Sequence, residues 1–312
     1  MKPPIVYVDG KFVPEAEARV PILTHALQYG TGVFEGIRAY HDPHRDELLL
    51  FRALDHFERM QRNVKFLKIR LPHVPQKLVE IAAQLVRLNQ LQTDTYIRPI
   101  AYKAATRIGV TLPTLDAFAM YAVAMGPYLD TQSGLHCGVS SWRRLADNSI
   151  PCRAKICGAY VNSALAADEA RERGFDEAIL LNEAGRVTEG SAMNLFLVRD
   201  GKLFTPDAAQ GILEGVTRDT VMTLARELLG VETEVRGVDR AELYIADEVF
   251  LCGTAAELAP VTRIDGREVG NGAPGRLSLD LQELYTRAVR GRLPQYHGWV
   301  TAIRETSPAA AS

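Results

Sequence analysis

Short runs rich in apolar, β-branched and aromatic residues recur along the chain, as is typical of strands. Longer runs between some of them carry apolar residues at helical spacing. In chain order the first part of the pattern predicts two short strands within 5–13 around an Asp9-Gly10 turn, a short helix at 24–30, strands at 32–40 and 47–52, helices at 53–68 and 75–91, and strands at 95–104 and 115–125.

Residues 126–134 (GPYLDTQSG) have the glycine, proline and polar content of a linker, and the pattern starts again beyond them. The second part predicts a strand at 135–142, a helix at 158–174, hairpins at 176–190 and 194–206, a helix at 216–230 that ends at Gly230, a strand followed by a loop across 246–261, and a disordered tail after about residue 306. The prediction is therefore an α+β protein with a small N-terminal domain at 1–127, a linker at 128–134 and a larger C-terminal domain at 135–312.

Composition narrows the class of protein. With 47% hydrophobic and 24% charged residues the chain is an average globular protein, and 312 residues suggest two domains. A net charge of −2 provides no basic field for nucleic acid or an anionic membrane. The sequence has no apolar run of about 18 residues and no apolar leader before Asp9 and Glu15, so a cytoplasmic location is expected. Its four cysteines suit isolated core positions, and its seven histidines show no metal-ligand spacing.

Lysine is scarce, since only eight of the 36 basic residues are lysines. Lys155 stands in PCRAKICGAY, directly ahead of a predicted helix, with Ala154 and Ile156 as neighbours. Apolar surroundings disfavour the charged form of an amine, and only the neutral amine attacks a carbonyl group. The competing interpretation is a lysine that buries its stem and carries its amine to water, and taken alone that interpretation is favoured.

A second feature lies about 35 residues further along the chain. It consists of EGSAMNLF at 189–196, LFT at 203–205 and LEGVTR at 213–218. These residues resemble the class IV aminotransferase signature, with its acidic start, its Asn before an apolar-aromatic pair, its L-x-T and its closing L-x-G-V-x-R. HALQYGTGVFEGIRAY, YIRPIAY, AKICGAY and ADEVFLCGTAAELAPV extend the resemblance to the branched-chain amino acid aminotransferases, over roughly residues 5–270.

This resemblance implies a two-domain enzyme of fold type IV, with pyridoxal 5′-phosphate (PLP) at the interface between a small N-terminal and a larger C-terminal α+β domain. Lys155 is then the catalytic residue and carries PLP as a Schiff base, while Tyr160 hydrogen-bonds the ring oxygen of the cofactor. Glu189 faces the pyridine nitrogen, where a carboxylate keeps that nitrogen protonated and lets the ring accept electrons. Without the resemblance, Glu189 would be a solvated hairpin residue and Tyr160 a half-buried one.

The resemblance also implies the rest of the cofactor site. Val216 and Thr217 open a helix whose N-terminal amides suit a phosphate, although Thr217 also suits a structural N-cap. Arg59 is the positive partner of the phosphate, Leu213 packs on the ring face, and Thr254 adds a hydroxyl group. A surface helix charge at Arg59 and a simple core role for Leu213 are the structural alternatives.

The substrate pocket follows from the same resemblance. Arg98 corresponds to the residue that receives the distal carboxylate of glutamate, and the Thr254 and Ala255 amides to those that hold the α-carboxylate. One pocket must accept an apolar branched side chain and a carboxylate, so an arginine at the rim of an aromatic box is reasonable. In the resemblance, the walls or edges of the pocket are Phe34, Gly36, Tyr96, Tyr128 and Tyr160, with Met125 at a further wall position. Alternate residues of a strand share a face, so Arg38 is expected on the face of Phe34 and Gly36, and Tyr96 on the face of Arg98. Tyr29 and Val110 correspond to residues that reach in from a neighbouring subunit.

One position departs from the family pattern. Met125 stands where the related bacterial enzymes carry Trp, so the pocket wall is expected to be softer there and the side-chain preference is open. The implied activity is transamination of the branched-chain L-amino acids leucine, isoleucine and valine with 2-oxoglutarate, which gives branched 2-oxo acids and L-glutamate. Because the pocket borrows residues from a second subunit, a homodimer is the smallest assembly expected.

Several alternatives remain at this point. Within fold type IV they are a D-amino acid aminotransferase, an (R)-selective amine aminotransferase and aminodeoxychorismate lyase, and YIRP together with GVFEGIRAY favours the branched-chain interpretation over all three. A non-catalytic metabolite-binding protein predicts a lost lysine or acid, but both Lys155 and Glu189 are present. A cofactor-free Schiff-base aldolase has no use for the phosphate-site residues Arg59, Val216 and Thr217.

Overall fold

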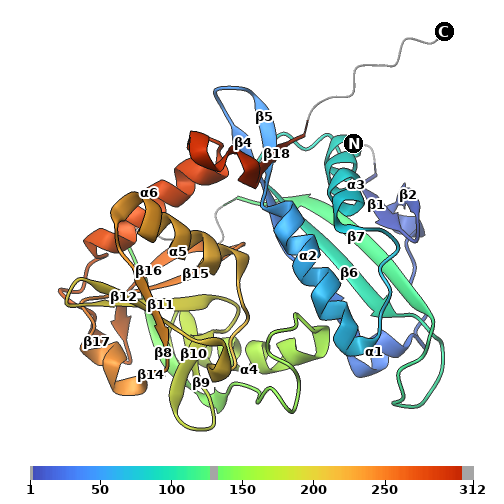
Figure 1. Ribbon diagram of the computed structural model, residues 1–312. Helices are drawn as coiled ribbons and strands as arrows, with labels where there is room; N and C mark the ends of the chain where they lie inside the picture. The colour runs from blue at the N-terminus through green and yellow to red at the C-terminus, as the bar shows by residue number, and fades with distance from the viewer. Residues whose placement is uncertain (1–2, 127–132, 304–312) are drawn as a thin grey trace. The chain divides into compact units, whose positions relative to one another are not determined.

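Two separate sheets organise the chain in a computed structural model that describes residues 3–126 and 133–303 (Figure 1). The first unit is Met1–Gly126 together with Arg287–Ser312, and the second is Pro127–Thr286. Each unit contains helices and strands, which confirms the α+β class. The prediction differs at the C-terminus, because it placed all of 135–312 in the second domain. Residues beyond Thr286 belong instead to the first unit, since β18 (Val300–Ala302) pairs antiparallel with β5 (Glu47–Phe51).

The first unit is built on an eight-stranded sheet in the order β18-β5-β4-β6-β7-β1-β2, with β3 beside β6. Its remaining strands are β1 (Ile5–Val8), β2 (Lys11–Pro14), β3 (Gly32–Phe34), β4 (Ile37–Asp42), β6 (Thr95–Lys103) and β7 (Asp116–Ala124). The predicted hairpin at 5–13 is confirmed, and Asp9 and Gly10 turn it with φ of 45° and 91°, the left-handed values that a two-residue turn requires. The predicted single strand at 32–40 is wrong in one respect, because the chain breaks at Glu35 and Gly36 into β3 and β4.

Helices cover one face of this sheet. Figure 1 shows α2 (Ala53–Asn63) and α3 (Pro75–Leu88) side by side along it, and α1 (His25–Tyr29) is a single short turn. The predicted helix at 53–68 continues beyond α2 as the 3-10 turn Val64–Leu67. Along β6 every second residue is buried, which places Ile97 and Ala101 in the core and leaves Tyr96 and Arg98 on the more open face.

The second unit is built on a ten-stranded sheet in the order β13-β12-β11-β15-β16-β8-β9-β10-β14, with β17 beside β16. Its strands are β8 (Leu135–Arg143), β9 (Glu177–Leu181), β10 (Arg186–Gly190), β11 (Asn194–Arg199), β12 (Lys202–Pro206), β13 (Thr233–Arg236), β14 (Val238–Asp239), β15 (Glu248–Gly253), β16 (Glu257–Ile264) and β17 (Arg267–Glu268). Both predicted hairpins are confirmed as the pairs β9–β10 and β11–β12. The loop predicted after β15 is wrong from Glu257 onward, where β16 begins.

The core of the second unit covers one face of its sheet, and β11, β15 and β16 are buried at nearly every position. Leu195 and Leu197 of β11, Leu251 of β15 and Val261 of β16 point to one face and belong to a single buried cluster. The α-helices in the described part of the unit are α4 (Tyr160–Glu172), α5 (Val216–Leu229) and α6 (Arg276–Val289). The last three residues of α6 belong to the first unit, and this helix was not predicted. Gly230 ends α5 in the left-handed conformation, with φ of 66°, as the sequence indicates.

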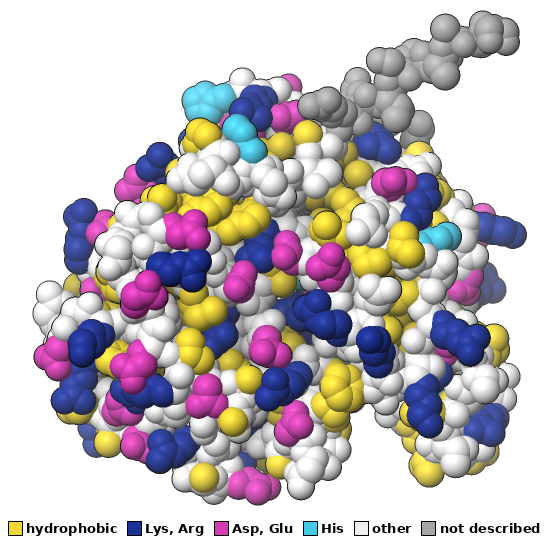
Figure 2. Space-filling model, viewed as in Figure 1, with side chains coloured by type: hydrophobic (Ala, Val, Ile, Leu, Met, Phe, Trp, Pro, Cys, Tyr) yellow, Lys and Arg dark blue, Asp and Glu magenta, His cyan; other side chains and the backbone are white. Residues whose placement is uncertain are grey.

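The visible surface carries no block of one charge sign. Figure 2 shows Lys and Arg interspersed with Asp and Glu, which agrees with the net charge of −2. Within residues 3–126 and 133–303, none of the helices has the length and apolar character needed to cross a membrane. The predicted linker and the predicted disordered tail fall largely outside the described residues.

Candidate active site

Lys155 and Tyr160 form the first part of the candidate site. Lys155 lies in the segment between β8 and α4, is half-buried, and is followed by a 3-10 turn that leads into Tyr160, the first residue of α4. The Lys155 Nζ donates to Tyr160 Oη at 2.6 Å and lies 5.1 Å from the centre of the tyrosine ring. The first turn of α4 therefore fixes the position of the amine.

Glu189 on β10 forms the second part. Its side chain is 5% exposed, and its Oε1 lies 2.8 Å from Nη2 of Arg144, which is itself 9% exposed. Its Oε2 accepts hydrogen bonds from Asn194 Nδ2 and from the Leu213 amide, both at 3.0 Å. Both carboxylate oxygens are thus held by donors, so the group is fixed in one orientation.

Electrostatics link these two parts. Burial raises the pKa of the Glu189 carboxyl above its usual range, while the charges of Arg144 and Lys155 and the Leu213 amide oppose that rise. Burial lowers the pKa of Arg144, but the Glu189 carboxylate, followed by smaller effects that include Tyr160, raises it above its usual value. Electrostatic effects therefore connect Glu189 with Arg144 and Lys155, and Arg144 with Tyr160, within the second unit.

The N-terminus of α5 lies beside this carboxylate. Val216 and Thr217 are the first two helical residues, as predicted, but Gly215 and not Thr217 is the N-cap residue. The structural alternative for Thr217 is therefore wrong, because its backbone is already helical. Leu213, three residues before the helix, donates its amide to Glu189 and accepts from Asn194 Nδ2 at 2.8 Å. The amides of the first turn of α5 therefore come shortly after Leu213, whose own amide binds Glu189.

Gly215 is required by close packing. A Cβ atom there would lie 2.1 Å from Oδ1 of the buried Asn194, whose amide holds Glu189. We expect Gly215→Ala to lower the free energy of unfolding by about 1–3 kcal/mol, because Asn194 must move and lose a hydrogen bond. Thermal unfolding measures this, with Gly298→Ala, where a Cβ meets nothing within 4 Å, as the matched control. Equal melting temperatures for the two variants would contradict the expectation.

Thr254 and Ala255 lie in the turn between β15 and β16. Cys252, at the end of β15, pairs with Asn194 at the start of β11. The turn therefore leaves the sheet at the end where Asn194 contacts Glu189, which brings Thr254 and Ala255 to the same end of the second unit.

Other residues of the signature serve the scaffold. Arg218, in the first turn of α5, donates from Nε to Thr205 Oγ1 at 3.2 Å and from Nη2 to the Pro206 carbonyl at 3.0 Å. Thr205 in turn donates to the Leu195 carbonyl at 2.8 Å. These bonds fix α5 to β12 and β11, so they hold the helix N-terminus in place without facing the lysine.

In the first unit, Arg59 lies on α2 in a buried ionic cluster. Its Nε and Nη2 donate to the two carboxylate oxygens of Glu35, each at 2.7 Å, and His56 Nδ1 lies 2.9 Å from Glu35 Oε2. Burial raises the pKa of the fully buried Glu35, but the charge and hydrogen bonds of Arg59 and His56 hold it well below the usual range. Arg59 is therefore not the surface helix charge of the structural alternative. Its guanidinium is oriented by the carboxylate of Glu35, which lies at the break between β3 and β4.

Tyr96 and Arg98 share the open face of β6, as their spacing predicts. The Arg98 guanidinium lies 4.4 Å from the Phe34 ring centre and 5.1 Å from that of Tyr96. Its Nε and Nη2 donate to Tyr96 Oη at 3.1 and 2.7 Å. Gly36 leaves room for this arrangement, since a Cβ there would lie 2.3 Å from Tyr96 Oη. The structure thus brings these four predicted substrate residues together.

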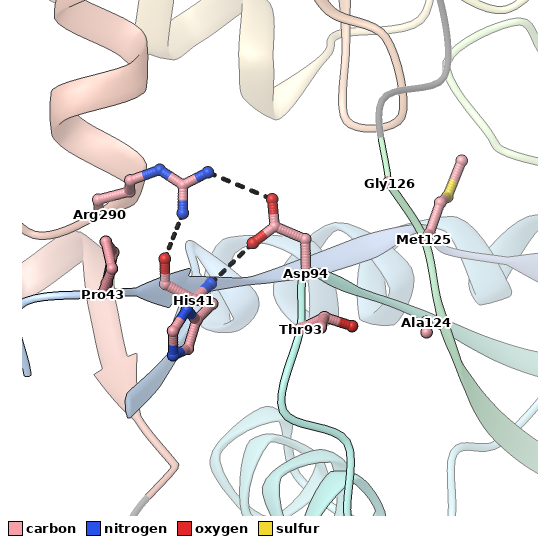
Figure 3. Close-up of a pocket in the computed structure, with 8 residues that line it drawn as sticks. All are labelled: His41, Pro43, Thr93, Asp94, Ala124, Met125, Gly126 and Arg290. Atoms are coloured by element: carbon pink, nitrogen blue, oxygen red, sulfur yellow. Dashed lines mark hydrogen bonds and ion pairs between the residues drawn. The ribbon is translucent and has the colours of Figure 1, made fainter. Parts of the chain in front are cut away.

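Arg38 has different partners from those expected. It is buried, and its Nη2 donates to the carbonyls of Met125 at 2.9 Å and Gly126 at 3.4 Å. Met125 lines a cavity of about 500 Å³ in the first unit (Figure 3). There Asp94 accepts from the His41 amide and pairs with Arg290 at 3.3 Å. Through these two hydrogen bonds Arg38 fixes the backbone at Met125 and Gly126.

Tyr29 and Val110 lie on one surface of the first unit. Tyr29 Oη accepts from the Gly109 amide at 3.1 Å, next to Val110, whose side chain is 77% exposed. Tyr29 and Val110 are therefore close together and accessible to contact by another molecule. Tyr128, the remaining predicted substrate residue, lies outside the described residues.

Three side chains that contact predicted site residues were not predicted from the sequence. Arg144 pairs with Glu189, and Glu35 and His56 hold Arg59. Glu35 had a usable signal, because a carboxylate inside an apolar strand requires a partner when it is buried. Arg144 follows another arginine at the end of β8, and nothing in its local sequence singles it out.

The chain thus folds into two α+β units, and the second unit contains both the Lys155–Tyr160 pair and the buried Glu189 carboxylate. Residues 32–264 match the model of the family described as amino-transferase class IV. The chain belongs to this family.

Relatives cover almost the whole chain. A protein of Aquifex aeolicus (strain VF5) named probable branched-chain-amino-acid aminotransferase is 47% identical over 95% of this chain and 96% of its own. The branched-chain amino acid aminotransferase of Thermobaculum terrenum, solved in its PLP form, is 38% identical with a TM-score of 0.93 over 97% and 99% of the two chains. The branched-chain aminotransferase of the archaeon Thermoproteus uzoniensis, solved with norvaline, is 42% identical with a TM-score of 0.92 over 96% and 99%.

Proposed function

We propose that this chain is a PLP-dependent aminotransferase that exchanges amino groups between the branched-chain L-amino acids leucine, isoleucine and valine and 2-oxoglutarate. The observation that carries the proposal is the Lys155–Tyr160 pair, whose amine acts electrostatically on the buried Glu189 carboxylate. The names of the Aquifex aeolicus and Thermobaculum terrenum relatives support the substrate class.

The residues of the second unit fit PLP. Lys155 offers an amine for the aldehyde of the cofactor, and Glu189 offers a buried anion for a protonated ring nitrogen. The N-terminus of α5, at Val216 and Thr217, offers amides for the phosphate. When bound, PLP supplies the aldehyde and an electron-accepting ring. Arg59 would add positive charge at the phosphate, in the orientation that Glu35 gives it.

Lys155 has two tasks in this proposal. Its Nζ would bond to the cofactor aldehyde first and, once an incoming amino acid has taken that place, would accept the proton from the substrate Cα. The Tyr160 hydroxyl, 2.6 Å from Nζ, keeps the amine in place between these tasks. Glu189 would stabilise a positive charge on the ring nitrogen, and the Arg144 charge favours the ionised form of Glu189 against the effect of its burial.

A donor panel tests this function. The holoenzyme is incubated with 2-oxoglutarate and L-leucine, D-alanine or (R)-1-phenylethylamine, and the 2-oxo acid or ketone product is measured together with glutamate. Turnover with L-leucine well above that with the other two donors is expected. A preference for D-alanine or the amine would instead indicate one of the other fold type IV aminotransferases. Absence of amino transfer from every donor would refute the proposal and favour the lyase.

We further propose that two copies of the chain associate. The first unit exposes apolar side chains on α1, on the segment before it and on the loop that follows β6, and a β-bridge between Thr24 and Thr106 joins these segments. Exposed apolar surface of this extent marks an interaction site. The side chains are Val20, Ile22, Leu23, Leu27, Ile108, Val110 and Leu115, each more than half exposed.

Ile108, at 83% exposure, is the residue to replace. We expect sedimentation equilibrium to give the mass of a dimer or of a larger even-numbered assembly. Ile108→Asp should weaken association by at least tenfold in dissociation constant, because it buries an unpaired charge. Val235→Asp, at an exposed position of the second unit, is the control. A monomeric wild-type protein would contradict the dimer. The proposed reaction is tested separately by the donor panel.

A further inference from the structure

The contact between Tyr96 and Arg98 is unusual because one neutral oxygen satisfies two N–H groups of a guanidinium. Tyr96 Oη accepts from both Nε and Nη2, so it occupies the side of the guanidinium fork that a carboxylate would bind with two parallel hydrogen bonds. The guanidinium carbon lies 4.4 Å from the centre of the Phe34 ring and 5.1 Å from that of the Tyr96 ring. In this arrangement aromatic rings surround Arg98, and the tyrosine hydroxyl holds its Nε and Nη2 donors.

The proposed reaction sets two opposing requirements for such a residue. A branched apolar side chain next to a guanidinium with unsatisfied N–H groups would cost binding free energy, because those donors would lose water without gaining an acceptor. A dicarboxylate substrate needs the same N–H groups for its distal carboxylate. Both requirements are met if an acceptor from the protein holds the donors and gives them up to a carboxylate.

We propose that the Tyr96 hydroxyl is the internal ligand of Arg98 that a dicarboxylate substrate displaces, and that Tyr96 thereby determines specificity. With an apolar side chain in the site, the Tyr96–Arg98 bonds stay formed. With a distal carboxylate, both N–H groups of Arg98 exchange the neutral hydroxyl for a charged acceptor, which binds them more strongly. This inference rests on the proposed function, since it assumes that one site takes both substrate types.

Gly36 supports the exchange. A Cβ atom at this position would lie 2.3 Å from Tyr96 Oη and 3.0 Å from Tyr96 Cζ. Any larger residue at 36 would therefore push the hydroxyl away from its present place. The absence of a side chain at Gly36 leaves the Tyr96 ring its position against Arg98.

The test compares two unreactive ligands on the holoenzyme. Glutarate represents the dicarboxylate and 4-methylpentanoate the apolar substrate, and calorimetry gives both dissociation constants. Tyr96→Phe should bind glutarate about tenfold more tightly, because no hydroxyl competes for Arg98, and 4-methylpentanoate about tenfold more weakly, because the Arg98 donors lose their acceptor. The ratio of KM values for leucine and 2-oxoglutarate should shift in the same sense.

Two further variants separate specificity from general damage. Tyr102→Phe removes a hydroxyl from the same face of β6, about 13 Å along the strand from Arg98, and should leave both constants unchanged. In an Arg98→Met background, which should lose glutarate binding at least tenfold, Tyr96→Phe should have no further effect on the glutarate constant. If Tyr96→Phe weakens both ligands equally, or changes neither, the inference is overturned. Wild-type turnover in the donor panel is a separate result, so failure of the proposed function is recognised independently.

Discussion

Replacing Lys155 by alanine should lower the rate of amino transfer by more than about 10³-fold and remove the visible absorbance of the holoenzyme. In the proposed reaction one amine both holds the cofactor and moves the Cα proton, so alanine removes both tasks at once. The structure adds that Tyr160 is hydrogen-bonded to the Lys155 amine and that the charge of Lys155 acts on Glu189. Single-turnover kinetics with L-leucine and an absorbance spectrum measure the two effects.

The control for this variant is Lys202→Ala. Lys202 is exposed at the start of β12, on the hairpin turn, and should retain both rate and spectrum. Circular dichroism of Lys155→Ala should match the wild type, since Lys155 is half-buried and lies in the segment between β8 and α4, outside the strands and helices. A Lys155→Ala protein that still turned over leucine at an appreciable rate would overturn the proposed mechanism.

The signature residues near the C-terminal half divide into two groups that the sequence alone does not separate. Glu189, Asn194 and Leu213 form one hydrogen-bonded group around the carboxylate. Thr205 and Arg218 form another that joins α5 to β12. The residues of the motif therefore stabilise the fold of this region as well as hold the carboxylate.

Local sequence patterns predicted the strands and helices that depend mainly on neighbouring residues. The apolar runs of β11 and β15 mark two strands that are buried along almost their whole length, and Gly230 marks the end of α5. The pairing of β18 with β5 joins residues about 250 positions apart, so nothing in either segment indicates it. The same holds for Arg144, which meets Glu189 only because β8 and β10 flank β9 in the sheet.

The first unit shows the same limit in its charged residues. Arg59 was singled out by resemblance, yet its orientation depends on Glu35, which lies 24 positions earlier on another element. For Tyr96 and Arg98, spacing along one strand was enough, because residues two apart share a face. The shared face of Tyr96 and Arg98 could therefore be predicted from spacing along one strand, whereas the contact of Arg59 with Glu35 depends on how α2 packs against the sheet.

The second large effect is expected at Glu189. Glu189→Gln keeps the shape of the side chain but removes its charge, so the proposed ring nitrogen loses the anion that keeps it protonated. We expect kcat to fall on the order of 10²–10³-fold, the usual effect of removing one preorganised charged partner. Steady-state kinetics with L-leucine measure this, and Glu183→Gln, at an exposed position of the β9–β10 turn, should have no effect.

The same substitution leaves Arg144 as a buried charge without its carboxylate, which should cost about 3–5 kcal/mol of stability. A lower rate could then reflect a damaged fold. Adding Arg144→Met removes the stranded charge, so the double variant should regain most of the melting temperature while its kcat stays low. Recovery of kcat together with stability would contradict a chemical role for Glu189, because it would mean that the carboxylate served only to hold Arg144.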